Sequence, residues 1–153
     1  LNTAVANSSL LIATKFGMDV TLLIPDEAYL LDSQFMDAAS ENAAAHDRQL
    51  TVTTDIDVAY ADAEVVYCKS WGALPCYGDP ETEWQLRQKY RHFIVDGEKM
   101  ARTRQALFSH CLPLRRNIKA TDEVMDADYC IAIDEAENRL HVQKAIMTHL
   151  ARQ

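Results

Sequence analysis

The fold class is decided by residues 106–113, which read Ala-Leu-Phe-Ser-His-Cys-Leu-Pro. Its first part, residues 106–111, is a short and mostly apolar run that stops at Pro113, which is typical of a buried strand in a parallel sheet. Residues 20–24, 65–68 and 130–133 have the same character, and residues 50–54 alternate like a strand near a sheet edge. The sequence therefore predicts five strands.

Helical patterns separate these strands. Residues 2–16 carry apolar side chains at helical spacing and end at Gly17, a residue that often caps helices. A second helix is expected from Asp26 to about Ala45, and Asp79-Pro80 marks the start of a third, which reaches about Arg91. Shorter helices are expected at 97–104 and 122–125, before a closing helix with Ala136, Leu140, Met147 and Leu150 on one face.

Strands joined by helices predict an α/β fold, a doubly wound, mostly parallel, Rossmann-like sheet flanked by helices. The chain opens on a helix, whereas such folds usually open on a central strand. We therefore expect a sheet that lacks its first strand, in a single domain over residues 1–153 that has been trimmed from a longer protein.

Composition narrows the class of function. The net charge of −8 argues against nucleic acid as a ligand, although Arg115, Arg116 and Lys119 form a local basic group suited to small anions. No apolar run approaches the roughly 20 residues that span a bilayer, and the N-terminus has no basic stretch typical of a signal peptide. The four cysteines form no C-x-x-C pair, so neither a zinc site nor an oxidising compartment is favoured. We expect a cytoplasmic protein.

Three polar segments follow the predicted strands, at residues 69–72, 110–117 and 134–139. Ligands of doubly wound sheets bind beyond the carboxyl ends of the strands. These segments supply cations and backbone groups at that edge, which suits an anionic ligand. A dinucleotide has no support, because the chain has no G-x-G-x-x-G loop.

The same segments carry a family resemblance. His110-Cys111-Leu112-Pro113 resembles the H-C-L-P signature of the ornithine carbamoyltransferase group. Residues 110–126, 69–72 and 135–139 together resemble the N-acetylornithine carbamoyltransferases, in matching order and spacing, and the likeness extends over the chain from Asn2 onward. The resemblance implies the amino-acid-binding domain of a two-domain enzyme of arginine biosynthesis, a homotrimer without metal or organic cofactor.

One departure from ordinary ornithine carbamoyltransferases has a chemical meaning. Those enzymes place a D-x-x-x-S-M-G segment, whose aspartate receives the α-amino group of ornithine, where this chain has residues 65–72. Here the acid is missing and Lys69 stands nearby. An acylated α-nitrogen carries no charge, while the α-carboxylate needs a cation. The acceptor is thus expected to be N-acetyl-L-ornithine; N-succinylornithine is the alternative, and Lys119 favours the acetyl form.

The resemblance also assigns roles to single residues. It implies substrate-binding roles for Asn2, Lys69, Arg115 and Lys119, carbamoyl-phosphate-binding roles for His110, Leu112 and Arg139, and catalytic roles for Cys111, Leu112 and Arg115. Cys111 and Leu112 would act through backbone carbonyls that fix the δ-amine and the carbamoyl NH₂. In this family the Leu-Pro bond is cis, which is expected here for Leu112-Pro113.

Several of these residues have plainer interpretations. Cys111 can be a core thiol or, as a third reading, a nucleophile, although nothing implies a covalent intermediate. His110 can be a structural hydrogen-bonding residue rather than an acid or base. Lys119 is carboxylated in some relatives, which requires a neutral amine, but it can equally be an unmodified lysine on an exposed turn.

The remaining candidates are open in the same way. Lys69 can be a solvated lysine at a strand end, and Asn2 an ordinary helix N-cap. Arg115 and Arg139 suit phosphate and carboxylate, but they can also be plain surface arginines. The family's phosphate-binding S-x-R-T loop is absent from the chain, so the chain alone is expected to be inactive. A non-catalytic α/β module that binds small anionic metabolites is the alternative of another class.

Overall fold

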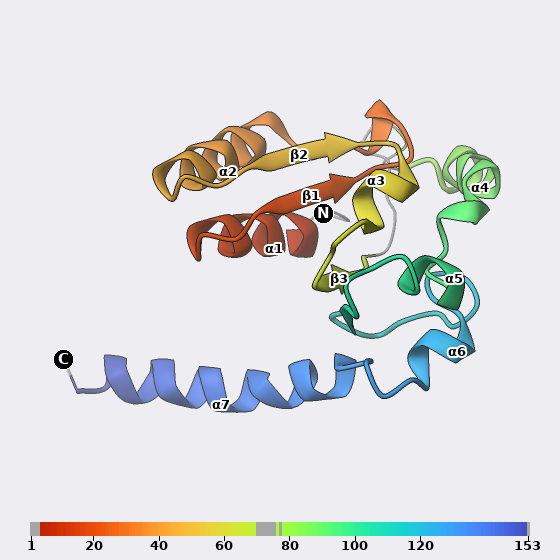
Figure 1. Cartoon of the computed structure of the whole chain (residues 1–153). Helices are drawn as coiled ribbons and strands as arrows, with labels where there is room; N and C mark the ends of the chain where they lie inside the picture. The colour runs from red at the N-terminus through yellow and green to blue at the C-terminus, as the bar shows by residue number, and fades with distance from the viewer. Residues whose placement is uncertain (1–3, 70–75, 77, 153) are drawn as a thin grey trace. The chain divides into compact units, whose positions relative to one another are not determined.

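The computed structural model describes residues 4–69, 76 and 78–152 (Figure 1). The elements in chain order are α1 (Ala4–Lys15), β1 (Val20–Leu23), the 3-10 helix η1 (Glu27–Tyr29), α2 (Ser33–Ala45), β2 (Leu50–Thr53), α3 (Ile56–Tyr60), β3 (Val65–Tyr67), α4 (Pro80–Lys89), the 3-10 helix η3 (Arg91–Phe93), α5 (Gly97–Met100), β4 (Leu107–Ser109), α6 (Asp122–Met125) and α7 (Ala132–Leu150). They fall into two compact units. The first comprises Leu1–Ala61 and Lys69–Phe93, and the second comprises Asp62–Cys68 and Ile94–Gln153.

The first unit is built on the parallel pair β1–β2, with Val20 opposite Leu50 and Leu23 opposite Thr53. Figure 1 shows α1 and α2 packed beside this pair. Gly17 ends α1 with a φ of 71°, in the left-handed region that glycine enters at little cost, so its predicted capping role is confirmed. A buried cluster of Leu10, Leu31 and Ala39 joins the helices to the sheet.

The expected helix from Asp26 to Ala45 is wrong in its first part. The side chain of Asp26 caps only η1, and the backbone is extended at Leu30. A second aspartate, Asp32, then accepts a hydrogen bond from the amide of Gln34 at 3.0 Å and starts α2. Two N-caps six residues apart compete for the same segment, and the later one controls the long helix.

Two further helices of this unit begin at aspartates. Asp79 accepts from the amide of Thr82 at 3.1 Å with Pro80 in the first turn, so the predicted start of α4 is confirmed. The helix α3 was not predicted, although Asp55 accepts from the amides of Asp57 and Val58 at 2.8 and 3.2 Å. Its five residues are too few for a helical period to show in the sequence.

The second unit contains the parallel pair β3–β4, in which Val65 lies opposite Leu107 and Tyr67 opposite Ser109. Phe108 and Val124 are fully buried in its core. The expected fifth strand at 130–133 is wrong. Only a single bridge, Phe108 to Cys130, forms there, and α7 begins at Ala132. The amide of Cys130 bonds instead to the carbonyl of Ala127, so the chain turns before a ladder can grow.

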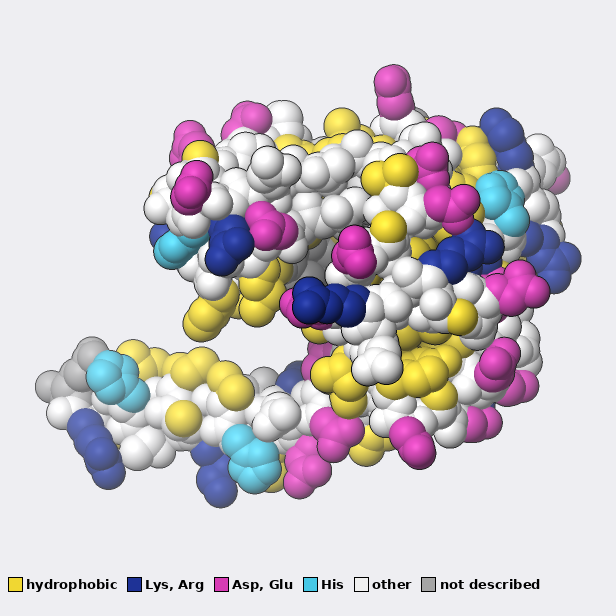
Figure 2. All heavy atoms as spheres, viewed as in Figure 1, with side chains coloured by type: hydrophobic (Ala, Val, Ile, Leu, Met, Phe, Trp, Pro, Cys, Tyr) yellow, Lys and Arg dark blue, Asp and Glu magenta, His cyan; other side chains and the backbone are white. Residues whose placement is uncertain are grey.

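The predicted α/β class is confirmed, because each strand pair in the described residues is parallel and helices follow the strands. The last helix, α7, carries large apolar residues that solvent reaches, including Leu140, Met147 and Leu150 at 59–62% exposure. Figure 2 shows hydrophobic side chains gathered along one side of this helix. Across the described residues, no helix combines the length and the apolar character that crossing a membrane requires.

Candidate functional site

The candidate site is built on the carboxyl ends of β3 and β4. The amide of Cys68 donates to the carbonyl of Ser109 at 3.0 Å, which carries the pairing one residue past β3. The His110 motif leaves β4 from this point. Parallel pairing thus brings the H-C-L-P segment to the strand edge at which α/β folds bind ligands, as predicted.

His110 is the most enclosed of the candidate side chains, at 1% exposure. Its Nδ1 accepts a hydrogen bond from the amide of Leu112 at 2.9 Å. A neutral ring that accepts at Nδ1 carries its proton on Nε2, and the Nε2 atom is itself buried. This geometry matches the structural hydrogen-bonding role, in which His110 fixes the backbone two residues further along the chain.

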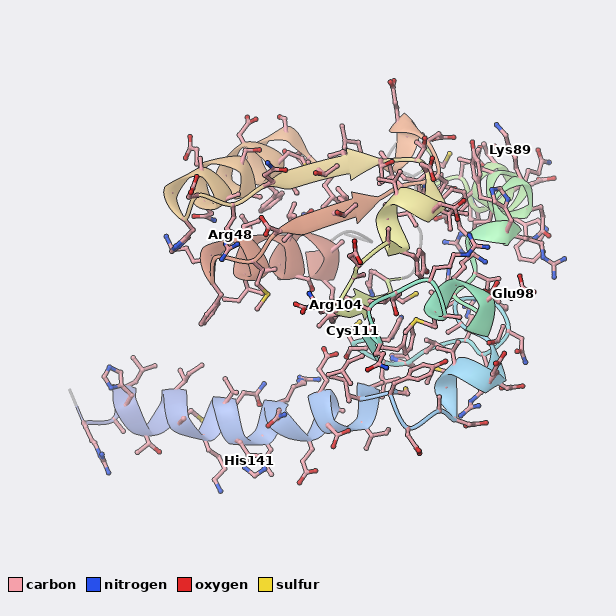
Figure 3. All side chains as sticks on the ribbon, in the orientation of Figure 1. Arg48, Lys89, Glu98, Arg104, Cys111 and His141 are labelled. Carbon is pink, nitrogen blue, oxygen red and sulfur yellow. The ribbon has the colours of Figure 1, made fainter. Side chains whose placement is uncertain are left out.

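The segment after His110 has an unusual backbone. The Leu112–Pro113 peptide bond is cis, as predicted, and Leu112 has a φ of 47°. The side chain of Cys111, labelled in Figure 3, is half-buried, so it is not the core thiol of the plain interpretation. The backbone carbonyls of Cys111 and Leu112, on either side of this turn in the chain, are the groups of interest.

Lys119 lies at the end of a tight turn whose other residues are exposed. Its amide donates to the carbonyl of Arg115 at 3.1 Å, and its own carbonyl accepts from the amide of Val95 at 2.9 Å. The thiol of Cys68 lies 3.8 Å from that same carbonyl. Lys119 is only 4% exposed, so the alternative of a lysine on an exposed turn is wrong. Burying an ammonium group is costly unless it is paired or chemically changed.

The basic group predicted from the sequence is divided. Arg116 contacts Asp122 at 3.0 Å and Asp126 at 2.6 Å, while Asn117 donates to Asp122 at 2.7 Å. The hydrogen bond from Asn117, followed by that from Arg116, lowers the pKa of Asp122, and Arg116 lowers that of Asp126. Arg116 is therefore a structural residue that joins the loop to α6, whereas Arg115, which is exposed like Arg116, pairs with no carboxylate among the described residues.

Glu135 is a residue that the sequence analysis did not single out. One of its carboxylate oxygens accepts from the hydroxyl of Tyr67 at 3.1 Å, and the other accepts from the hydroxyl of Ser109. Tyr67 and Ser109 are the last residues of β3 and β4. The only signal in the sequence was an acid in the first turn of a helix, which usually serves the helix itself.

Fewer contacts define the positions of the other candidate residues. Arg139 is exposed on α7, one turn after Glu135. Lys69 is half-buried and belongs to the first unit. Asn2 and residues 70–72 lie outside the described residues. The cysteines are free thiols, and among the described side chains no three of His, Cys, Asp or Glu gather as metal ligands would.

Comparison with known proteins agrees with this geometry. The N-acetylornithine carbamoyltransferase of Xanthomonas axonopodis pv. citri (strain 306) is 64% identical over 153 residues, all of this chain and 45% of that protein. The ornithine carbamoyltransferase of Methanobrevibacter smithii (strain ATCC 35061 / DSM 861 / OCM 144 / PS) is 34% identical over 146 residues, 95% of this chain and 47% of that protein. The chain thus spans less than half the length of these relatives.

A solved structure of acetylornithine transcarbamylase complexed with acetylcitrulline superposes with a TM-score of 0.94. It is 65% identical in sequence, over 98% of this chain and 45% of that one. The family described as aspartate/ornithine carbamoyltransferase, Asp/Orn binding domain, matches residues 1–150. With the H-C-L-P segment at a parallel strand end and the family's match over nearly every residue, the chain belongs to the aspartate/ornithine carbamoyltransferases, in their Asp/Orn binding domain.

Proposed function

We propose that this chain is the amino-acid-binding half of an N-acetylornithine carbamoyltransferase. The observation that carries the proposal is that sequence identity is much higher with N-acetylornithine carbamoyltransferases than with ornithine carbamoyltransferases. It is 61–64% with four N-acetylornithine carbamoyltransferases and 34–39% with four ornithine carbamoyltransferases. The acid that receives a free α-amino group is also absent beside Lys69, which supports an acylated acceptor.

The reaction is acyl transfer. The neutral δ-amine of N-acetyl-L-ornithine attacks the carbamoyl carbon, the bond from that carbon to the phosphate oxygen breaks, and phosphate leaves with the electron pair. The surplus proton of the attacking nitrogen passes to the departing phosphate, which gives N-acetyl-L-citrulline. Catalysis comes from orientation, worth about 7–11 kcal/mol in favourable cases, and from stabilising charge as it develops. No metal or organic cofactor takes part in these steps.

Each candidate residue has one task in this proposal. The carbonyls of Cys111 and Leu112 hold the δ-amine and the carbamoyl NH₂, and the enclosed ring of His110 keeps that backbone in place. Arg115 and Arg139, both exposed, bind the anionic groups of substrate and carbamoyl phosphate. For the amino acid itself, Lys69 binds the α-carboxylate, with Asn2 and Lys119 as further contacts.

Lys119 is carboxylated at its amine in this proposal. Its enclosure supports the modification, because burial disfavours the charged ammonium and the neutral amine is the form that adds carbon dioxide. Protein expressed with ¹³C-bicarbonate should show a carbamate carbon resonance that disappears in Lys119→Arg. An identical resonance in the variant would assign the carbamate to another lysine and remove this part of the proposal.

The whole enzyme requires a second domain that binds carbamoyl phosphate, in a cytoplasmic homotrimer. Two observations support such a second domain. The chain spans 45% of its first relative's length, and α7 exposes Leu140, Met147 and Leu150 to solvent. An apolar helix face of this kind is normally covered by protein. The chain alone is expected to give no turnover, and turnover like that of an intact enzyme would contradict the proposal.

The test joins this chain to the carbamoyl-phosphate half of the Xanthomonas relative and measures citrulline formation. Carbamoyl phosphate is paired in turn with ornithine, N-acetylornithine and N-succinylornithine. Turnover with N-acetylornithine alone supports the proposal, whereas turnover with free ornithine refutes the argument from Lys69. Binding of substrates without turnover identifies the non-catalytic module instead.

One observation favours N-succinylornithine as the alternative acceptor. Point mutants of N-acetyl-L-ornithine transcarbamylase have been solved in complex with carbamyl phosphate and N-succinyl-L-norvaline, with a TM-score of 0.94 to this chain. That scaffold therefore holds a succinylated ligand after one substitution. A preference for N-succinylornithine in the assay would select this alternative.

A further inference from the structure

We propose that Glu135 is a positioning residue that locks the carboxyl ends of β3 and β4 to the start of α7. The role rests on the proposed function, because it concerns the same reaction. Through this lock Glu135 sets the place of the His110 segment and the direction of Arg139. Glu135 itself touches neither substrate in this proposal.

The geometry of the lock is specific. The Oε1 atom of Glu135 accepts from the hydroxyl of Tyr67 at 3.1 Å, and Oε2 accepts from the hydroxyl of Ser109. Ser109 is 4% exposed, while Glu135 and Tyr67 are half-buried. Hydrogen bonds to an ionised carboxylate are roughly twice as strong as neutral ones. One side chain thus joins three segments that are 26 to 68 residues apart in sequence.

Two of the joined residues, Ser109 and Glu135, lie close in the chain to candidate site residues. Ser109 directly precedes His110, whose Nδ1 holds the amide of Leu112 at 2.9 Å. The carbonyl of Ser109 also accepts from the amide of Cys68 at 3.0 Å, so the two strand ends are fixed by backbone and side chain together. Arg139 lies four residues after Glu135, on the same face of α7. A displaced strand end would therefore move carbonyls and guanidinium at once.

The start of α7 also explains why an acidic residue occupies position 135. Ile131, the N-cap of α7, offers no side-chain oxygen to the first helical amides. A carboxylate in the first turn is favoured there by the positive end of the helix dipole. Since both oxygens of Glu135 already accept hydrogen bonds, this carboxylate is a poor candidate for a general base.

The experiment uses the joined two-domain protein and five variants. Glu135→Ala removes the lock, and Glu135→Gln keeps its shape with an amide that can still bond both hydroxyls. Ser109→Ala with Tyr67→Phe removes the two donors, alone and combined with Glu135→Ala. Glu41→Ala, an exposed glutamate on α2, is the matched control. The readouts are kcat and KM for both substrates, and amide hydrogen exchange at Cys68 and Leu112.

We expect Glu135→Ala to lower kcat/KM about 10- to 100-fold, the cost of misplacing catalytic groups by about 1 Å. Glu135→Gln should recover most of this loss. The triple variant should match Glu135→Ala, because the residues act as one unit. Normal kinetics in Glu135→Ala, a Gln variant as poor as Ala, or losses that multiply in the triple variant would each overturn the proposal.

Failure of the proposed function gives a different result. In that case the unsubstituted joined protein turns over none of the three acceptors. The lock is then tested by hydrogen exchange alone. Faster exchange at Cys68 and Leu112 in Glu135→Ala, but not in Glu41→Ala, supports it, and unchanged exchange refutes it.

Discussion

Replacing His110 separates its two possible roles. The ring is 1% exposed and its Nδ1 accepts from the amide of Leu112 at 2.9 Å. His110→Ala removes that acceptor, at about 1 kcal/mol for the lost hydrogen bond, and leaves a cavity. Together these should lower the free energy of unfolding by about 2–4 kcal/mol. Losing the fixed backbone after His110 should also reduce kcat/KM about 100-fold.

His110→Asn is the decisive comparison. An asparagine oxygen can accept from the amide two residues further on, as it does in Asx turns, so it can replace Nδ1 without supplying an acid or base. If His110 positions the backbone, His110→Asn should recover much of the activity lost in His110→Ala, with an unchanged pH profile of kcat/KM.

The assay is citrulline formation by the joined two-domain protein, with urea unfolding of each variant. Activity as low in His110→Asn as in His110→Ala, together with the loss of one limb of the pH profile, would refute the positioning argument and assign proton transfer to the imidazole.

Three further predictions concern other parts of the chain. Lys69→Met should raise KM for N-acetylornithine about 10- to 100-fold, as expected for a lost charge-assisted bond of about 1.5–3 kcal/mol, and leave KM for carbamoyl phosphate unchanged in the same assay. Burial, followed by the charge of Asp26, raises the pKa of Tyr29 to about 12, above its ordinary value of about 10. The Tyr29 hydroxyl therefore ionises at a lower pH in the unfolded protein than in the folded one, and the free energy of unfolding should fall between about pH 10 and pH 12. Urea unfolding of Tyr29→Phe should show a smaller fall, and an equal fall would contradict this assignment. Arg116→Gln should raise the pKa of Asp126 toward its ordinary value, which an NMR titration measures. The pKa of Asp126 is lower in the folded protein than in the unfolded one, so its carboxylate stabilises the fold above the unfolded pKa, and this stabilisation is lost as the pH falls. The variant should therefore lose less stability on acidification than the unsubstituted protein.

Much of the fold follows from local sequence signals. Proline stops, the glycine after α1 and the aspartate-proline pair before α4 predicted where elements begin and end, and each is observed. The errors arose where two signals overlapped. Asp26 and Asp32 are both good N-caps, and sequence alone does not say which one starts the long helix.

The apparent strand at 130–133 failed for a tertiary reason. Its apolar residues are equally suited to the first turn of a buried helix end, and Ala132 is 1% exposed in that role. On this side of β4, both the amide and the carbonyl of Phe108 are already bonded in the single bridge to Cys130. Short apolar runs of this kind carry no period that distinguishes a strand from a helix start.

The candidate site was predictable only where it has a motif. The H-C-L-P segment predicted where the strand ends and, through the resemblance, predicted the cis peptide bond at Leu112–Pro113. Glu135 was missed because its partners, Ser109 and Tyr67, are 26 and 68 residues away in sequence. The burial of Lys119 was missed for a similar reason, since Val95 pairs with the turn from outside the motif.

An acidic chain can bind two anionic ligands if the carboxylates near the site are occupied locally. Asp122 and Asp126 pair with Arg116, and Glu135 accepts from two hydroxyls. Within the described part of the chain, neither Arg115 nor Arg139 forms an ion pair, and both are exposed. A guanidinium without a carboxylate partner binds phosphate without first breaking a salt bridge. The net charge of −8 therefore bears on long polyanions, which meet the whole surface, and says little about small anions at these two arginines.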